Sequence, residues 1–136
     1  MQTIIMTIKP VHLGNIRRGR KKGELRKTFP KCGIPFRVLL CESGSGGQIK
    51  AEFTCRDVRA IDAPSQFFSD ILFLKEQEIA DYLCGKTGYV WGVSDVVDYC
   101  STKGYRIKNI SGFGLSRPPQ SWQYARKETS KNESKC

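Results

Sequence analysis

Histidine is scarce in this sequence and paired cysteines are absent. The 136 residues include one histidine, His12, and six cysteines, none of which forms a C-x-x-C pair. Structural zinc sites need closely spaced cysteine and histidine ligands. The sequence therefore argues against a metal site, and we expect the protein to use neither a metal nor another cofactor. Most of the cysteines are expected to fill core positions as small apolar residues.

The sequence also lacks a long apolar run. No stretch approaches the roughly 20 apolar residues that a membrane-spanning helix needs. The opening MQTIIMTIK is too short for a signal peptide and has no small-residue cleavage site. We therefore expect a cytoplasmic protein with no membrane contact.

Acidic residues are few compared with basic ones. The chain has 13 Asp and Glu residues against 23 Lys and Arg residues, a formal net charge of +10. The imbalance is greatest over residues 9–31, which hold nine cations and a single acid, Glu24. Clustered cations gain free energy by displacing counterions from phosphates, so this pattern favours RNA, another nucleic acid or a nucleotide as the partner. The alternative is a solvated face that only keeps the protein soluble.

Two well-known phosphate-binding motifs are incomplete. Gly85-Lys86-Thr87 resembles the end of a P-loop, but the first glycine of that motif would fall on Ala80. Gly112 and Gly114 lack the third glycine of a dinucleotide fingerprint, because Arg117 stands at that position. A nucleotide site in this chain would be of another kind.

Hydrophobic patterns predict five or six strands and two short helices. Strands are expected over 3–8, 22–26, 36–42, 48–62, 89–99 and 105–110, and the fourth has a slip in its alternation that is typical of a bulge. Helices are expected over 10–18, between a proline and a glycine, and over 75–84, before a glycine. Residues from about 64 to 74 are expected to form a loop.

The order of these elements predicts the fold class. Because the strands mostly follow one another, we expect an α+β fold, mainly β, arranged as a mixed or antiparallel barrel. The domain is expected to cover residues 1–125, and the polar residues 126–136 are expected to be a disordered tail.

The basic stretch carries a recognisable pattern. Gly19-x-Lys21-x-x-Glu24-x-Arg26 resembles the G-x-K-x-x-E-x-R signature of the ASCH domain, a branch of the PUA-like β-barrel superfamily. Other segments resemble the small stand-alone ASCH proteins of bacteria and phages in the same order, namely the opening IIMTIKP, residues 81–86, the strand from residue 89 to 94 and the closing RPPQSW. The resemblance spans residues 3 to about 124. It implies a PUA-like barrel with a cleft lined by the signature, in a superfamily associated with RNA binding, transcription coactivation and modified-base chemistry.

The signature residues form the candidate binding site. We expect a basic cleft made by Lys9, Gly19, Lys21, Glu24 and Arg26. Lys21 and Arg26 suit a phosphate. A lone carboxylate among cations stays ionised, so Glu24 either orients the two cations, which we favour, or accepts hydrogen bonds from the amino edge of a base.

Aromatic and hydroxyl groups are expected near this cleft. Trp91, Tyr89 and Trp122 are candidates for stacking a base at its mouth, although aromatic residues in strands are more often core residues. Ser94 and Ser43 are candidates for hydroxyl contacts to a ligand, on weaker grounds because polar turn residues are common.

The resemblance also implies an enzymatic alternative. One branch of the superfamily hydrolyses the acetyl amide of N4-acetylcytidine, with a lysine at the position of Lys21 and a threonine nucleophile at the position of Glu24. A carboxylate does not replace an activated hydroxyl, so this departure argues against that activity here. Hydrolysis of a modified nucleoside or of single-stranded RNA, with Lys21 and Glu24 as the acid/base pair, stays open. So does a role in binding another protein.

Overall fold

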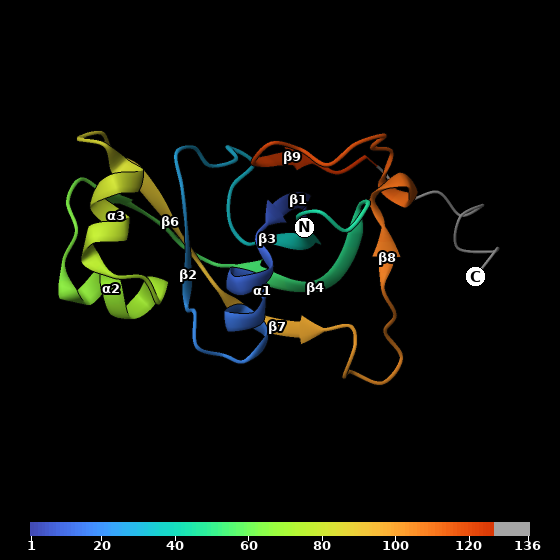
Figure 1. Cartoon of the computed structure of the whole chain (residues 1–136). Helices are drawn as coiled ribbons and strands as arrows, with labels where there is room; N and C mark the ends of the chain where they lie inside the picture. The colour runs from blue at the N-terminus through green and yellow to red at the C-terminus, as the bar shows by residue number, and fades with distance from the viewer. Residues whose placement is uncertain (127–136) are drawn as a thin grey trace.

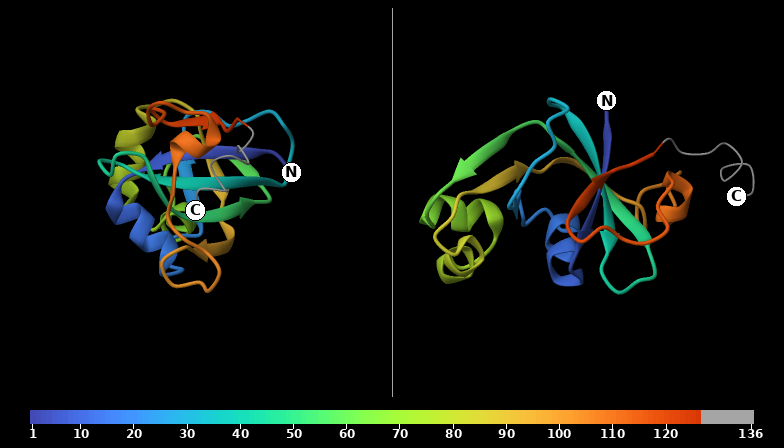
Figure 2. Two further views of the ribbon diagram at one scale, coloured as in Figure 1. Left: turned by 90° about the vertical axis from the view of Figure 1, so that its right-hand side faces the viewer. Right: turned by 90° about the horizontal axis from the view of Figure 1, so that it is seen from above.

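Two β-sheets and three α-helices form the part of the chain that the computed structural model describes, residues 1–126 (Figure 1). In chain order the elements are β1 (Thr3–Ile8), α1 (Pro10–Arg17), β2 (Gly23–Arg26), β3 (Phe36–Glu42), β4 (Gln48–Cys55), β5 (Val58–Ile61), α2 (Gln66–Leu72), α3 (Glu76–Leu83), β6 (Gly88–Gly92), β7 (Ser94–Asp98), β8 (Lys108–Asn109), the 3-10 helix η1 (Ile110–Phe113) and β9 (Trp122–Tyr124). Seen from above, α2 and α3 lie at one end of the molecule, η1 lies at the other, and α1 lies between them (Figure 2).

The larger sheet has its core on both faces. Its order is β7-β4-β3-β1-β9, with β8 pairing to β4, and β1 runs parallel to β3 while the other pairs are antiparallel. Alternate residues of β1 explain its central place: Ile4 and Met6 pack with the apolar face of α1 in one cluster, and Ile5 packs against η1 in another. A strand that is apolar on both faces is stable only where both faces are covered.

The smaller sheet has the order β2-β6-β5 and is antiparallel. The two helices α2 and α3 cover it, and its core joins Leu25, Ile61 and Val90 from the strands to Leu72 and Ile79 from the helices. Burying one face of a sheet under amphipathic helices is the ordinary way to complete a small α+β layer.

Two chain segments pass from one sheet to the other at the same point. The expected strand over 48–62 is split into β4 and β5, and the strand over 89–99 is split into β6 and β7. The backbone N–H of Gly92 donates to the carbonyl of Asp57 at this crossing, and a Cβ at Gly92 would collide with the Asp57 side chain. The slip in the alternation therefore marks a change of sheet rather than a bulge within one strand.

The fold class expected from the sequence is confirmed, with differences in its elements. The fold is α+β and mainly β, but the described strands form two sheets that do not close into one barrel. A third helix, α2, occupies the expected loop, where the Ser65 hydroxyl accepts a hydrogen bond from the Phe68 N–H at the helix start. The expected strand over 105–110 is reduced to two residues followed by η1.

Two further expectations concern the ends of the chain and the membrane. The expected disordered tail lies outside the described residues from residue 127 onward. Within residues 1–126, the helices are all too short or too polar to cross a bilayer.

Candidate functional site

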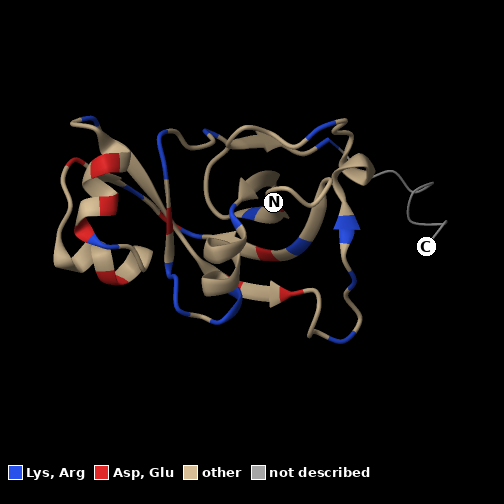
Figure 3. Cartoon of the chain, in the orientation of Figure 1, with Lys and Arg blue, Asp and Glu red and all other residues tan. Residues whose placement is uncertain are grey.

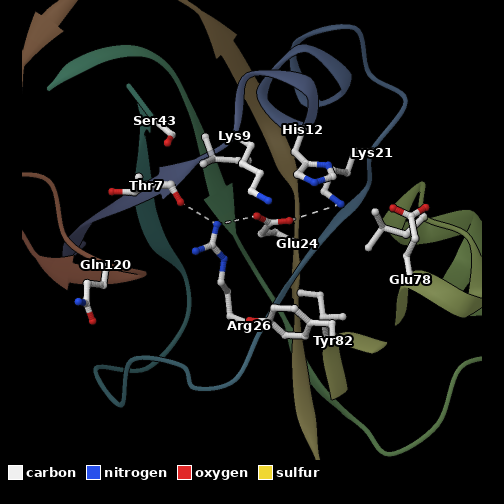
Figure 4. Close-up of a pocket in the computed structure, with 13 residues that line it drawn as sticks. Thr7, Lys9, His12, Lys21, Glu24, Arg26, Ser43, Glu78, Tyr82 and Gln120 are labelled. Carbon is white, nitrogen blue, oxygen red and sulfur yellow. Dashed lines mark hydrogen bonds and ion pairs between the residues drawn. The ribbon is translucent and has the colours of Figure 1, made fainter. Parts of the chain in front are cut away.

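A pocket of about 370 Å³ opens where β1 and α1 face β2 and α3 (Figure 4). Its walls therefore come from both sheets and from two helices. The lining residues are Thr7, Ile8, Lys9, His12, Lys21, Glu24, Leu25, Arg26, Ser43, Leu74, Glu78, Tyr82 and Gln120.

The turn between α1 and β2 sets the position of the signature residues. Gly19 adopts φ +74°, and the N–H groups of Arg20 and Lys21 donate to the carbonyl of Asn15, which folds the chain back against the helix. Along β2, side chains alternate, so Glu24 and Arg26 share the pocket face while Leu25 packs in the core of the smaller sheet. The chain thus places a lysine, a carboxylate and a guanidinium together.

Lys21, Glu24 and Arg26 form a buried ionic cluster (Figure 4). Lys21 Nζ lies 3.4 Å from Glu24 Oε1, and Arg26 Nη2 lies 2.8 Å from Glu24 Oε2. The side chains are 1%, 7% and 11% exposed for Lys21, Glu24 and Arg26. Glu24 is therefore a bridging carboxylate between two cations, as the orienting role required.

Backbone groups hold both cations in place. Lys21 Nζ donates to the carbonyl of Leu72 at 2.5 Å. Arg26 donates to the carbonyl of Thr7 at 2.9 Å and to the hydroxyl of Ser121 at 3.2 Å. Each cation therefore ties β2 to another part of the chain, Lys21 to the end of α2 and Arg26 to β1 and to the segment before β9.

Burial and neighbouring charges act in opposite directions on the pKa values of Glu24 and Lys21. Burial raises the pKa of Glu24, but the nearby charges of Lys21 and Arg26 outweigh burial and hold that pKa below its ordinary value. Burial lowers the pKa of Lys21, and Glu24 only partly offsets the effect. The carboxylate is therefore firmly ionised, whereas the lysine loses its proton more readily than a solvated one.

An ionic cluster of this kind is costly to bury. Removing two or three charges from water costs several kcal/mol per ion before their attraction is counted, and apolar residues of similar size often give equal or greater stability. The cluster is thus weak evidence for a stabilising role. Perturbed, buried ionisable groups that face a pocket are more typical of functional sites.

Other polar groups surround the cluster. The Thr7 hydroxyl donates to the carbonyl of Pro119 at 2.6 Å, which leaves its oxygen free to accept. Burial and the charge of Lys21 lower the pKa of His12, so its imidazole is neutral at pH 7, and its Nδ1 is buried without a hydrogen-bond partner among the described residues. These groups, with Ser43 and Gln120, can give and accept hydrogen bonds to a ligand.

The pocket is less basic than the sequence indicated. Of the nine cations in residues 9–31, Lys9, Lys21 and Arg26 line it, and the acids Glu24 and Glu78 lie in the same lining. Figure 3 shows Asp and Glu residues on α2 and α3, and α3 contributes Glu78 to one wall of the pocket. The cations in the lining exceed the acids by one charge. Among these cations, Lys9 is exposed and has no salt bridge to another described residue.

Three residues expected at the site do not line the pocket. Trp91 is completely buried in the main core, where its Nε1 donates to the carbonyl of Thr28. Ser94 starts β7 and donates its hydroxyl to the carbonyl of Thr54. Gly19 shapes the turn but is solvent-exposed outside the pocket. In each case the contacts with neighbouring residues, which a motif cannot reveal, decide where the residue lies.

Two pocket residues that sequence reasoning missed come from α3. Glu78 and Tyr82 are one turn apart, so they share one face of the helix, while Ile79 and Leu83 face the core. The i, i+4 spacing of an acid and an aromatic residue beside a core-facing pair was the available signal. Its relation to the signature depends on how α3 packs, and the sequence does not give that packing.

No group of three or more His, Cys, Asp or Glu residues gathers at metal-binding distance within residues 1–126.

Comparison with solved structures identifies the fold. Two crystal structures of ASCH protein variants from Zymomonas mobilis, one with a serine-to-alanine and one with a tyrosine-to-phenylalanine substitution, each match with a TM-score of 0.77 at 18% identity. The matches cover 98% and 99% of this chain and 95% and 98% of those chains. No protein-family model and no curated protein matches the sequence.

The small α+β fold of this chain fits the PUA-like fold of these neighbours. More specifically, the fold is that of the ASCH proteins: a third crystal structure, of ASCH from Zymomonas mobilis, matches with a TM-score of 0.72 at 16% identity and covers 98% of this chain and 94% of that chain. The resemblance inferred from the signature is thus confirmed for the fold, over nearly the whole chain.

Proposed function

We propose that this protein binds a nucleotide unit, free or within RNA, in the pocket formed by β1, α1, β2 and α3. One observation carries the proposal: the buried cluster of Lys21, Glu24 and Arg26 faces a pocket of about 370 Å³. That volume lies within the roughly 300–1,000 Å³ of typical small-molecule sites. The net charge of +10 and the superfamily's association with RNA support the same ligand class. A role in RNA metabolism or transcription regulation would follow.

The hydrogen bonds within the cluster favour a base over a phosphate at its centre. Lys21 and Arg26 already donate to Glu24 and to backbone carbonyls, so little donor capacity is left for a phosphate. Glu24 has two carboxylate oxygens and accepts one contact at each, which leaves lone pairs for the amino edge of a base. Lys9, exposed at the mouth, is the cation that suits the phosphate.

Isothermal titration calorimetry tests this proposal. The full chain is titrated with AMP, CMP, GMP, UMP, ribose 5-phosphate and a short single-stranded RNA. Glu24→Gln should weaken binding of the amino-bearing bases by about tenfold or more, since a charge-assisted hydrogen bond is worth about 1.5–3 kcal/mol. Glu52→Gln is the matched control, because Glu52 is also ion-paired, to Arg37, but lies outside the pocket.

A second comparison isolates the phosphate contact. Lys9→Ala should weaken nucleotide binding and lower the slope of log affinity against log salt by about 1, whereas Lys31→Ala, in the same basic stretch but outside the pocket, should change neither. Absence of binding by the native chain to every probe would contradict the proposal.

A hydrolase is the second candidate, and the lowered pKa of Lys21 favours it. A lysine that releases its proton more readily can take one from a hydroxyl or a water. The pocket lining also includes two aliphatic hydroxyls, on Thr7 and Ser43. Glu24 is ion-paired to two cations, so its role would be to orient Lys21 rather than to attack the substrate.

Incubation with N4-acetylcytidine and with single-stranded RNA tests the enzymatic candidate. Turnover by the native chain that is lost in both Lys21→Met and Glu24→Gln, and kept in Glu52→Gln, would support it. Tight binding with no turnover of either substrate would leave binding as the function.

A further inference from the structure

Tyr82 is the one Phe, Tyr or Trp residue in the lining of the pocket. Its side chain lies beside Arg26 and on the opposite side of Glu24 from Thr7 and Ser43 (Figure 4). Burial raises the pKa of the Tyr82 phenol, and the nearby charges of Arg26 and Glu24 act on that pKa in opposite directions. An aromatic ring therefore borders the pocket next to the ionic cluster.

The ring is not needed to fill the core. On α3, Ile79 and Leu83 are buried against the smaller sheet, whereas Tyr82 is 37% exposed. A large ring left partly open at a pocket wall is a surface on which another flat group can pack. Lys27 Nζ lies over the ring, 5.4 Å from its centroid, in a cation–π contact that a base stacking on the same face would displace.

The aromatic residues that the sequence suggested for stacking are already engaged. Trp91 packs edge-on against Phe36 and Trp122, with centroid distances of 5.4 and 5.8 Å. Tyr89 packs against Phe29 at 4.7 Å. None of them borders the pocket, so a base in this pocket would have Tyr82 as its aromatic neighbour.

The charges on the two walls set an orientation for the ligand. Glu78 stands one helical turn from Tyr82 on the same face of α3, and a phosphate there would meet a like charge. Lys9 lies at the start of α1, on another wall, and is exposed. The electrostatics therefore place the uncharged base against α3 and the phosphate towards Lys9.

We propose that Tyr82 is the surface on which the nucleobase stacks, with its amino edge towards Glu24 and its phosphate towards Lys9. This proposal rests on the proposed nucleotide-binding function and deepens it. It assigns a base-binding role to a residue outside the signature. It also makes the site selective for nucleotides over sugar phosphates, because a ribose phosphate has no ring to stack.

Binding of AMP, CMP, GMP, UMP and ribose 5-phosphate to four variants of the full chain tests the proposal. Tyr82→Leu should weaken nucleotide binding roughly 5- to 150-fold, the usual range for losing one base–aromatic stack. Tyr82→Phe should bind within about twofold of the native chain, and Tyr82→Trp should bind at least as tightly, with quenching of the new indole by the bound base. Tyr105→Leu is the matched control, since Tyr105 is 44% exposed and stacks on Tyr99 away from the pocket.

The sugar phosphate separates stacking from general damage to the site. Any affinity for ribose 5-phosphate should be the same in the native chain and in Tyr82→Leu. Nucleotide affinity that is unchanged in Tyr82→Leu but lost in Glu24→Gln would overturn the role of Tyr82 and leave the proposed function standing. No nucleotide binding by the native chain would overturn both.

Discussion

Glu24 is the residue on which the stability of the site depends most. It is 7% exposed and neutralises two largely buried cations, each of which also donates a hydrogen bond to a backbone carbonyl. A buried charge that loses its partner costs far more than the intact pair contributes. Loss of Lys21 should cost less than loss of Glu24, because Glu24 keeps its ion pair with Arg26 when Lys21 is replaced.

This asymmetry gives a stability prediction. Glu24→Gln should lower the free energy of unfolding by about 3 kcal/mol, because Lys21 and Arg26 then lie buried together without a counter-charge. Lys21→Met should cost about 1 kcal/mol or less, since an apolar chain of similar volume replaces the ammonium and the bond between Glu24 and Arg26 survives. Urea unfolding followed by circular dichroism measures both. Equal costs for the two variants would contradict the bridging role of Glu24.

The same residue shapes the dependence of stability on pH. The pKa of Glu24 is lowered in the fold below its ordinary value of 4.5, so the unfolded chain takes up a proton before the folded chain does. Its contribution is therefore complete above about pH 4.5 and is lost as the pH falls through the folded pKa. The lowered pKa of His12 also reduces the stability of the fold as the pH falls below 6.5, the ordinary pKa of histidine, because the unfolded chain takes up that proton first. Glu24→Gln should flatten the loss of stability below pH 4.5, and an unchanged slope would show that other carboxylates cause it.

Single residues were predictable from the sequence where a motif fixed their chemistry. The signature brought Lys21, Glu24 and Arg26 together correctly as neighbours, because i, i+2 positions of a strand share a face and the turn before the strand adds Lys21. Trp91 pairs with Glu24 and so lies on the same face of the smaller sheet, but its ring packs in the main core outside the pocket lining. Which part of a sheet face is filled by core side chains depends on what packs there, and that information is spread over the whole chain.

At the scale of elements, α1 and β2, which border the site, each contain a glycine, and the two glycines have different surroundings. Gly14 lies in α1, where an added Cβ would meet only the mobile end of Arg18. Gly23 begins β2, where an added Cβ would come within 2.8 Å of both Ile71 Cγ2 and Val90 Cγ1 in the buried layer under α2. Neither glycine has a positive φ, so the surrounding space, rather than backbone strain, decides the effect of a substitution.

These two positions give opposite predictions for one substitution. Gly14→Ala should stabilise the fold by about 0.5–1 kcal/mol, the ordinary gain in a helix interior. Gly23→Ala should destabilise it by about 1–3 kcal/mol, because the core must open to accept the methyl group. Thermal unfolding of the two variants checks both signs. Stabilisation by Gly23→Ala would mean that α2 does not pack on β2 as described.

Elements were predictable where the hydrophobic period was clear and local. The strands β1 and β3 and the helix α1 follow from runs and bounding residues that the sequence displays directly. The helix α2 was missed, although Ser65 caps it, because its seven residues, QFFSDIL, are too few to show a clear helical period. The split of the two long strands was also hidden, since a slip in alternation looks the same for a bulge and for a change of sheet.

At the scale of the whole molecule, charge is distributed unevenly between the parts that border the pocket. The segment 66–83, which holds α2 and α3, has four acids and one lysine, although the chain as a whole carries +10. Acids therefore gather at the end of the molecule that carries these helices, and cations predominate over the rest (Figure 3). A ligand in the pocket would have Lys9 on one side and Glu78 and Tyr82 on the other, which suits the proposed nucleotide, with a phosphate at one end and a base at the other.

The overall architecture was only partly accessible from sequence. Composition and strand order predicted a mainly β fold, and the signature predicted its relation to ASCH proteins. The division into two sheets, and hence a pocket with walls from both, follows from pairings between segments far apart in the chain. The pairing of Arg26 with Ser121 is one such contact.

The most direct measurement is a titration of the 15N-labelled full chain with CMP, followed by amide chemical shifts in proton–nitrogen correlation spectra. The account predicts shift changes concentrated in three segments that line the pocket: residues 7–12, residues 21–26 and residues 74–82. Glu24→Gln should reduce these changes at equal ligand concentration. Shifts confined to another surface, such as the loop around Tyr105, or no shifts at millimolar CMP, would contradict the claim that this pocket binds nucleotides.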